Sequence, residues 1–181
     1  MGIIETTETI DTLGDLIRLL QETPTNELGE LPFDPDALAV DLEPFAIWKD
    51  GCYTRICLHR DSRVELILLC WSPSASTAVH CHAGSECWMH ICEGELTESA
   101  YDIDDETITH VNTRTISSGD RAHINDEKGL HMLANTSKKR SMSLHLYSPA
   151  VGACQMFDVL TKESTWVTLK YDRVLSAEDI G

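Results

Sequence analysis

Apolar residues in the first quarter of the chain repeat every three or four positions, which is the spacing of one face of a helix. The residues that carry this repeat are Ile10, Leu13, Leu16, Ile17 and Leu20. Turn-forming residues at 21–29 end this helix. Asp34 followed by Pro35 predicts the start of a second short helix, because Asp caps a helix and Pro fits its first turn. Pro44 closes the second helix.

The repeat changes to period two from about residue 46, which predicts β-strands. Ten runs separated by turn residues are candidate strands: Cys52–Leu58, Val64–Trp71, Cys87–Glu93, Leu96–Tyr101, Thr107–Ile116, Ala122–Asn125, Gly129–Asn135, Ser141–Tyr147, Gln155–Val159 and Thr165–Tyr171. Many short strands at this spacing are typical of a sandwich or barrel. We therefore predict one mainly all-β domain over residues 1–181, with a helical cap at 1–45 on a β-barrel at 46–181.

Composition excludes several classes of partner. The chain has 181 residues, of which 42% are hydrophobic and 24% charged, an ordinary globular mixture. Its formal net charge of −16 argues against nucleic acid or an anionic membrane as a partner, because both need a basic surface. No apolar run is long enough to span a membrane, and the acidic N-terminus lacks the basic start of a secretory signal. We therefore expect a cytoplasmic protein.

The cysteines favour the same compartment. There are seven of them, irregularly spaced and without a CxxC pair. We expect reduced thiols rather than a disulfide framework or a structural zinc site.

His80 and His82 are the first candidate metal ligands. Residues two apart in an extended segment point to the same side and lie about 7 Å apart along the chain. Two imidazoles so placed can occupy adjacent positions on one metal ion, although a solvated strand face explains the pair equally well. His131, which forms an H-x-x-x-N pattern with Asn135, is a third candidate.

A polar stripe follows one strand near the end of the predicted barrel. Ser143, His145 and Tyr147 share a face of this strand, because they alternate with apolar residues. One interpretation is a half-buried strand with its polar side in water. The other is a proton relay in which the serine holds the imidazole and the imidazole holds the tyrosine hydroxyl.

Tyr53 and Arg55 share a face of an earlier strand. An arginine that faces a barrel interior is unfavourable unless it is paired, but its fork of donors suits a carboxylate. The alternative is a surface arginine on an edge strand.

The histidine pattern resembles the two motifs of the cupin superfamily, G-x5-H-x-H-x3,4-E-x6-G and a later H-x3-N. Cupins commonly add the motif's glutamate as a fourth ligand. Here Glu86 has the right spacing from His82, but Cys87 keeps the six-residue spacing to Gly94. Alternation places the two side chains on opposite faces, so we expect Cys87 to point at the site and Glu86 to point away. Three neutral histidines would then hold the metal.

A larger ordered set of motifs resembles the mammalian-type cysteine dioxygenases of the cupin superfamily. These motifs are Tyr53-Thr54-Arg55, Cys70-Trp71, His80-x-His82-x4-Cys87, Ile124-Asn125-Asp126, Gly129-Leu130-His131 and Ser143-Leu144-His145-Leu146-Tyr147-Ser148-Pro149. The resemblance implies a cupin or jelly-roll β-barrel with N-terminal helices and a mononuclear Fe(II) bound by His80, His82 and His131. It also implies a cis peptide bond before Pro149.

The same resemblance implies that the partners are L-cysteine and O2 and that the product is cysteine sulfinic acid. Arg55, assisted by Tyr53 and Tyr147, would hold the substrate carboxylate. A thioether between Cys87 and Tyr147 would fix the tyrosine ring. We expect a monomer that binds neither nucleic acid nor membrane.

Two other functions stay open. One is dioxygenation of another small thiol, 3-mercaptopropionate or cysteamine, and the other is a non-enzymatic cupin that binds metal. Arg55 and Cys87 both favour cysteine as the substrate, because the resemblance links them to that preference.

The remaining thiols and imidazoles receive no role in the chemistry. Alternation should turn Cys81 away from the metal. Cys154 matches either a family cysteine at the site entrance or a small packed residue. The other histidines, assigned to surface or core packing, are His59, His90, His110 and His123.

Overall fold

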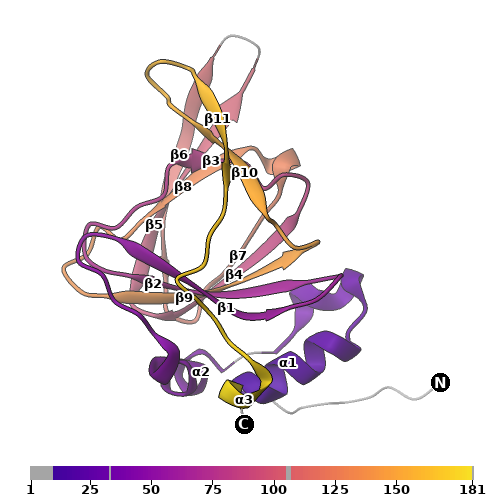
Figure 1. Ribbon diagram of the computed structural model, residues 1–181. Helices are drawn as coiled ribbons and strands as arrows, with labels where there is room; N and C mark the ends of the chain where they lie inside the picture. Colours follow the sequence, from indigo (N-terminus) through magenta and orange to yellow (C-terminus); the bar gives the residue numbers. More distant parts are fainter. Residues whose placement is uncertain (1–9, 33, 105–106, 181) are drawn as a thin grey trace.

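The computed structural model describes residues 10–32, 34–104 and 107–180 and consists mainly of two β-sheets above a layer of helices (Figure 1). The helices are α1 (Leu13–Glu22), α2 (Pro35–Leu42) and α3 (Ala177–Ile180), with 3-10 helices η1 (Thr25–Glu30), η2 (Glu43–Phe45) and η3 (Asp126–Lys128). The strands are β1 (Tyr53–Arg60), β2 (Glu65–Trp71), β3 (Val79–His80), β4 (Glu86–Glu93), β5 (Glu95–Ile103), β6 (Ile108–Ser117), β7 (Arg121–Ile124), β8 (Leu130–Ala134), β9 (Ser141–Ser148), β10 (Ala153–Phe157), β11 (Ser164–Thr168) and β12 (Arg173–Val174). The predicted fold class is confirmed.

Both predicted N-terminal helices are present and capped. Thr12 accepts the backbone N–H of Asp15 at 3.1 Å to begin α1, and Asp34 accepts the N–H groups of Asp36 and Ala37 to begin α2. The predicted turn region also forms η1, and Pro44 lies inside η2. Among the described residues, no helix combines the length and apolar character that crossing a membrane requires.

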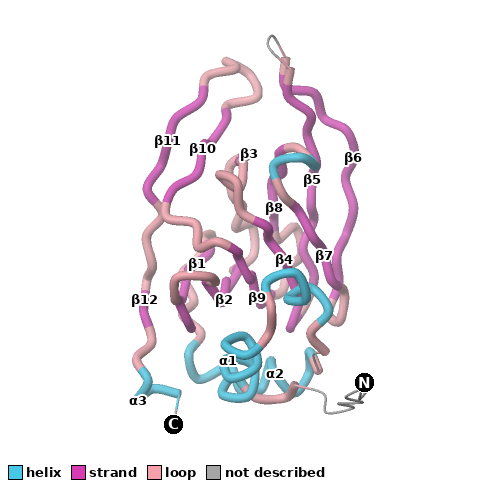
Figure 2. The backbone as a smooth tube through the Cα atoms, turned by 90° about the vertical axis from the view of Figure 1, so that its right-hand side faces the viewer, coloured by secondary structure: helices cyan, strands magenta, loops and turns pink. Residues whose placement is uncertain are grey.

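The strands form two six-stranded sheets. Their orders are β12-β1-β2-β9-β4-β7 and β11-β10-β3-β8-β5-β6. Each of the ten predicted strands corresponds to one in the structure, with ends that shift by a few residues. The two short strands β3 and β12 were not predicted, because two residues are too few to show alternation. Figure 2 shows β10–β11 and β5–β6 extending upward on either side of β3 and β8.

Strand β9 shows how the core is divided. Met142, Leu144 and Leu146 pack in a cluster with the buried leucines of α1 and α2. Tyr147 packs in a second cluster, with residues of the opposite sheet such as Leu133. The first sheet is therefore covered by helices on one face and by the other sheet on its second face. The Ser148–Pro149 peptide bond at the end of β9 is cis, as expected.

Candidate metal centre

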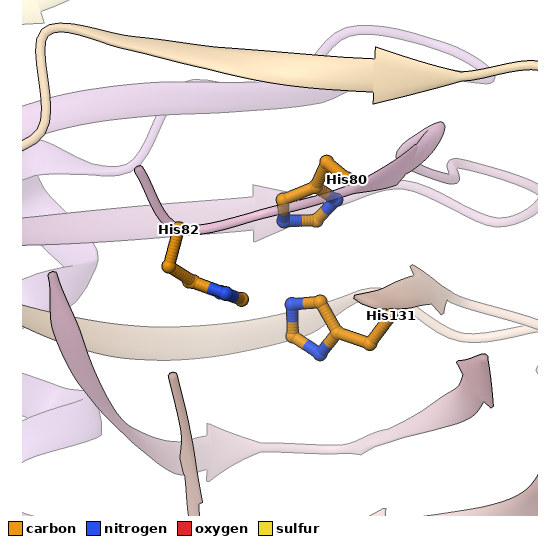
Figure 3. Close-up of side chains that lie close together, drawn as sticks. All are labelled: His80, His82 and His131. Carbon is orange, nitrogen blue, oxygen red and sulfur yellow. The ribbon is translucent and has the colours of Figure 1, made fainter. Parts of the chain in front are cut away.

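Three histidines from the second sheet meet between the sheets (Figure 3). His80 ends β3 and is paired directly with His131 on β8, while His82 follows two residues after His80. Each of them offers one ring nitrogen to a group whose members all lie within 4.8 Å of one another. The predicted pair and the third histidine are therefore brought together by strand pairing, with imidazole rings that converge on one point.

The donor set fits a metal ion. Both ring nitrogens of His82 are buried and lack a hydrogen-bond partner, which is unfavourable unless something else binds one of them. Burial, followed by the proximity of His131, lowers the pKa of His80 to about 3 and that of His82 to about 2. These imidazoles stay neutral at ordinary pH, and a neutral imidazole is the form that binds metals.

Two of the rings are oriented by acceptors on their outer side. The Nδ1–H of His80 donates to the carbonyl of Ala78 at 2.9 Å, and the Nδ1–H of His131 donates to Oε1 of Glu98 at 2.8 Å. Carbonyl and carboxylate oxygens only accept, so both rings keep the proton on Nδ1 and leave Nε2 for a metal. This arrangement supports coordination by neutral Nε2 atoms.

Glu98 was not predicted from the sequence. It is 5% exposed and also accepts a hydrogen bond from Arg114 at 2.6 Å. Burial alone would raise its pKa, but the hydrogen bonds and charges of His131 and Arg114 together hold it below the usual value. Its position in the sequence could have indicated a role. Glu98 shares the inward face of β5 with buried Leu96, where alternation predicts an apolar residue.

The triad lines a cavity with about 500 Å³ of empty volume, together with Tyr53 and Arg55. Nε and Nη2 of Arg55 are buried and have no hydrogen-bond partner. The interpretation as a surface arginine is therefore wrong, because the guanidinium faces the interior. Unpartnered donors there fit an anionic ligand, above all a carboxylate.

The C-terminal tail, in which the sequence showed no motif, helps to place Arg55. Asp172 accepts the backbone N–H of Arg55 at 2.8 Å and pairs with the ammonium group of Lys49. The tail also adds β12 in parallel to β1. The guanidinium carbon of Arg55 lies 5.8 Å from the ring centroid of Tyr171.

Cys87 and Tyr147 are directly opposite each other on β4 and β9. Both side chains are buried, at 1% and 6% exposure. Burial raises the pKa of Cys87 to about 12, and burial, followed by the proximity of Cys87, raises that of Tyr147 well above its usual value. Thiol and phenol are thus neutral neighbours. Glu86 points away and contacts His123 instead, as the spacing argument expected.

The polar stripe of β9 faces the interior rather than water. Trp71 donates to Ser143 Oγ at 2.9 Å, and Ser143 Oγ lies 2.9 Å from His145 Nε2. The serine oxygen accepts from the indole and, with its proton and second lone pair, can bond to either tautomer of the imidazole. The other nitrogen of His145 lies 3.9 Å from the sulfur of Cys87, and the rings of His145 and Tyr147 are stacked. Tyr147 lies directly opposite Cys87 in the strand pair, so its ring, the Cys87 thiol and the His145 imidazole are close neighbours.

Cys81 lies between two of the histidines, but its sulfur is not among the ligand atoms that converge there. Strand β3 ends at His80, so alternation does not continue through Cys81. Its sulfur accepts the backbone N–H of Gln155 at 3.4 Å, and the residue lines the cavity together with buried Cys154. The four other histidines contact other groups or are buried outside the triad: His59, His90, His110 and His123.

Comparison with known proteins agrees with this geometry. The family model "Cysteine dioxygenase type I" matches residues 5–160. The Rattus norvegicus protein named cysteine dioxygenase type 1 is 30% identical over 171 residues, covering 88% of this chain and 86% of that protein. The Danio rerio protein of the same name is 29% identical over 173 residues, covering 89% and 86%.

A solved structure supports the fold alone. A Thermus thermophilus protein superimposes with a TM-score of 0.50 at 20% identity and covers 60% of this chain and 94% of its own. Two β-sheets with N-terminal helices, a convergent histidine triad and the family match lead to one conclusion. The chain belongs to the cysteine dioxygenase type I family, a family of non-heme iron dioxygenases with the cupin fold.

Proposed function

We propose that the protein oxidises the thiol of free L-cysteine with O2 to cysteine sulfinic acid, at a ferrous ion held by His80, His82 and His131. The observation that carries the proposal is the buried guanidinium of Arg55, which lines the same cavity as the triad and has unpartnered donors. An amino acid bound through its sulfur at the triad could present its carboxylate to this group. The named relatives support the same substrate.

The ion would supply a binding position for the substrate thiolate and for O2, whose two oxygen atoms both end on sulfur. The protein contributes three neutral imidazoles, so the negative charge comes from the substrate. Arg55 binds the carboxylate and thereby orients the sulfur. Tyr53 lies beside it with a hydroxyl whose pKa is raised by burial, so it donates as a neutral group.

Tyr147 is placed to assist at the same cavity. Its ring stacks between His82 and His145, with centroids 6.4 Å and 6.2 Å away. The chain from Trp71 through Ser143 to His145 fixes the position of the imidazole ring. Burial lowers the pKa of His145 well below its usual value, so it acts in this proposal as a neutral spacer that fixes Tyr147 and Cys87.

The test uses protein loaded anaerobically with Fe(II), then supplied with cysteine and air. O2 consumption and sulfinate formation should match one to one, because cysteine plus O2 equals the product. Cysteamine lacks the carboxylate and 3-mercaptopropionate lacks the amine, so kcat/KM should fall for both. Absence of sulfinate refutes the proposal, and a higher kcat/KM for either analogue reassigns the substrate.

Arg55→Ala tests the residue that carries the assignment. Metal content should remain that of the parent, while kcat/KM for cysteine should fall about 10- to 150-fold, since a charge-assisted hydrogen bond contributes about 1.5–3 kcal/mol. The rate with cysteamine should change little, because it has no carboxylate to lose. Equal losses with both thiols would contradict the assigned role.

We also propose a thioether between Cys87 and Tyr147. The two residues are paired directly on β4 and β9, and both side chains are buried, which supports this bond. Formation of the C–S bond removes the thiol hydrogen and one ring hydrogen, and O2 takes up the two electrons and two protons, so the intact mass falls by about two hydrogens. Turnover should therefore produce a lighter species, and Cys87→Ala should abolish it; persistence of the shift in that variant would place the link elsewhere.

A further inference from the structure

We propose that Asp126 is a positioning residue for the metal centre, whose carboxylate fixes the turn that presents His82. Asp126 lies 44 positions after His82 in the sequence, and both of its carboxylate oxygens contact this turn. Oδ1 accepts the backbone N–H of His82 at 2.6 Å, and Oδ2 accepts that of Gly84 at 2.7 Å. The inference rests on the metal site of the proposed function and adds a residue to its support.

His82 depends on this carboxylate more than its two partners depend on theirs. The ring of His80 is held by the Ala78 carbonyl and that of His131 by Glu98. The ring of His82 has no hydrogen-bond partner on either nitrogen. Its direction is therefore set by its backbone, and Asp126 holds that backbone.

The turn after His82 needs an external acceptor. The N–H of Ser85 donates to the carbonyl of His82 at 3.0 Å and closes the turn. Its two central residues, Ala83 and Gly84, have φ values of 52° and 83°. The left-handed region is unfavourable for alanine, so such a conformation persists only where surrounding bonds enforce it. The two bonds to Asp126 are charge-assisted and supply this enforcement.

Asp126 is itself fixed at the start of η3. Asn125 caps this 3-10 helix by accepting the N–H of Lys128 at 3.1 Å, and its amide donates to Glu86. Gly129 follows with φ of 99°, where a side chain would meet the carbonyl of Tyr101. The chain then enters β8 and His131. The segment from Asn125 to His131 thus contains one member of the triad, His131, and holds the backbone of another, His82.

The experiment compares Asp126→Asn with Glu127→Gln. The first variant replaces one accepting oxygen by an NH2 group that faces an N–H donor, so one of the two bonds is lost. The second removes the same charge from the neighbouring residue, whose side chain has no hydrogen bond within the described ranges. Co(II) affinity of the metal-free proteins is measured by chelator competition, and the visible spectrum reports the ligand geometry.

We expect Asp126→Asn to raise the Kd for Co(II) about 10- to 100-fold and to alter the visible bands, as the loss of a ligand's support does. Glu127→Gln should match the parent. Adding Ala83→Gly to Asp126→Asn should recover part of the affinity, because glycine adopts the turn without strain. The inference is overturned by unchanged affinity in Asp126→Asn, by an equal loss in Glu127→Gln, or by no recovery in the double variant.

These measurements use neither cysteine nor O2. A protein that binds Co(II) in a manner dependent on Asp126 but forms no sulfinate refutes the proposed function and leaves this inference intact. Sulfinate formation by the parent, together with unchanged Co(II) affinity in Asp126→Asn, supports the proposed function and refutes this inference.

Discussion

Glu98 and Arg55 both reach the interior of the barrel, and they differ in what surrounds them. Glu98 is satisfied on both oxygens, by His131 and by Arg114. Arg55 has two buried nitrogens without partners. A buried charge that is already paired serves structure, whereas one that lacks a partner is ready for a ligand. In the proposed function, Glu98 therefore supports the metal site and Arg55 binds the substrate.

Glu98→Gln should weaken metal binding about 10- to 100-fold, because glutamine can still accept the Nδ1–H of His131 but no longer raises the basicity of the imidazole through its charge. Chelator competition on the metal-free protein measures the change. Glu95→Gln, on an exposed position of the same strand, is the matched control and should leave the affinity unchanged. An affinity within twofold of the parent in Glu98→Gln would contradict this role.

The sequence predicted those site residues whose placement follows from alternation along one strand or from a spaced motif. Ser143, His145 and Tyr147 share a face because they are two apart, and Cys87 and Glu86 are opposed for the same reason. The His80–His82 pair is equally local. The orientation of Arg55, which remained open between interior and surface, depended on the sheet that covers it.

The sequence did not predict the roles of the supporting residues, because their contacts join distant parts of the chain. Glu98 bonds a residue 33 positions away, Trp71 one 72 positions away and Asp126 one 44 positions away. No periodicity within a single element encodes such pairs. The fold class was predictable because the number of strands and the positions of the helices follow from local hydrophobic patterns. The order of strands in each sheet and the two-residue strands depend on tertiary pairing.

At the level of elements, one arginine of the barrel binds several carbonyl groups at the end of α1. Arg63, in the turn between β1 and β2, donates to the carbonyls of Leu20, Gln21 and Thr23 at 2.7–3.0 Å. These groups lie at the C-terminal end of a helix, where its dipole favours a cation. The loop and helix therefore stabilise each other.

Arg63→Ala should lower the free energy of unfolding by about 2 kcal/mol, since it removes charge-assisted hydrogen bonds to half-buried carbonyls. Urea unfolding of the metal-free protein measures the difference. Arg18→Ala is the control: its side chain is 56% exposed and paired with Asp15, so its loss should cost no more than about 0.5 kcal/mol. Equal effects would show that the contact with α1 is not specific.

At the level of the whole molecule, buried neutral histidines make stability depend on pH. Burial, followed by the charge of Arg121, lowers the pKa of His90 from 6.5 to about 3. The unfolded chain takes up this proton as pH falls below about 6.5, but the folded chain does not until about pH 3. Stability is therefore highest above pH 6.5 and declines as the pH falls. Buried His145 acts in the same direction.

The metal-free protein should lose about 1.4 kcal/mol of unfolding free energy through His90 alone between about pH 7.5 and about pH 5.5. Urea unfolding at both values tests this. The variant His90→Gln should show a smaller decline than the parent by about that amount. A decline of the same size in both proteins would mean that His90 carries its proton in the folded state.

Alternate positions of strand β9 face different surroundings and therefore tolerate different substitutions. Met142, Leu144 and Leu146 meet the helical layer, while the side chains between them serve the cavity. An altered helix can be accommodated by exchanging one apolar side chain on β9 for another, without touching any of the three histidines. A substitution that reshapes the contact between β9 and the helices can therefore leave the geometry of the three histidines as it is.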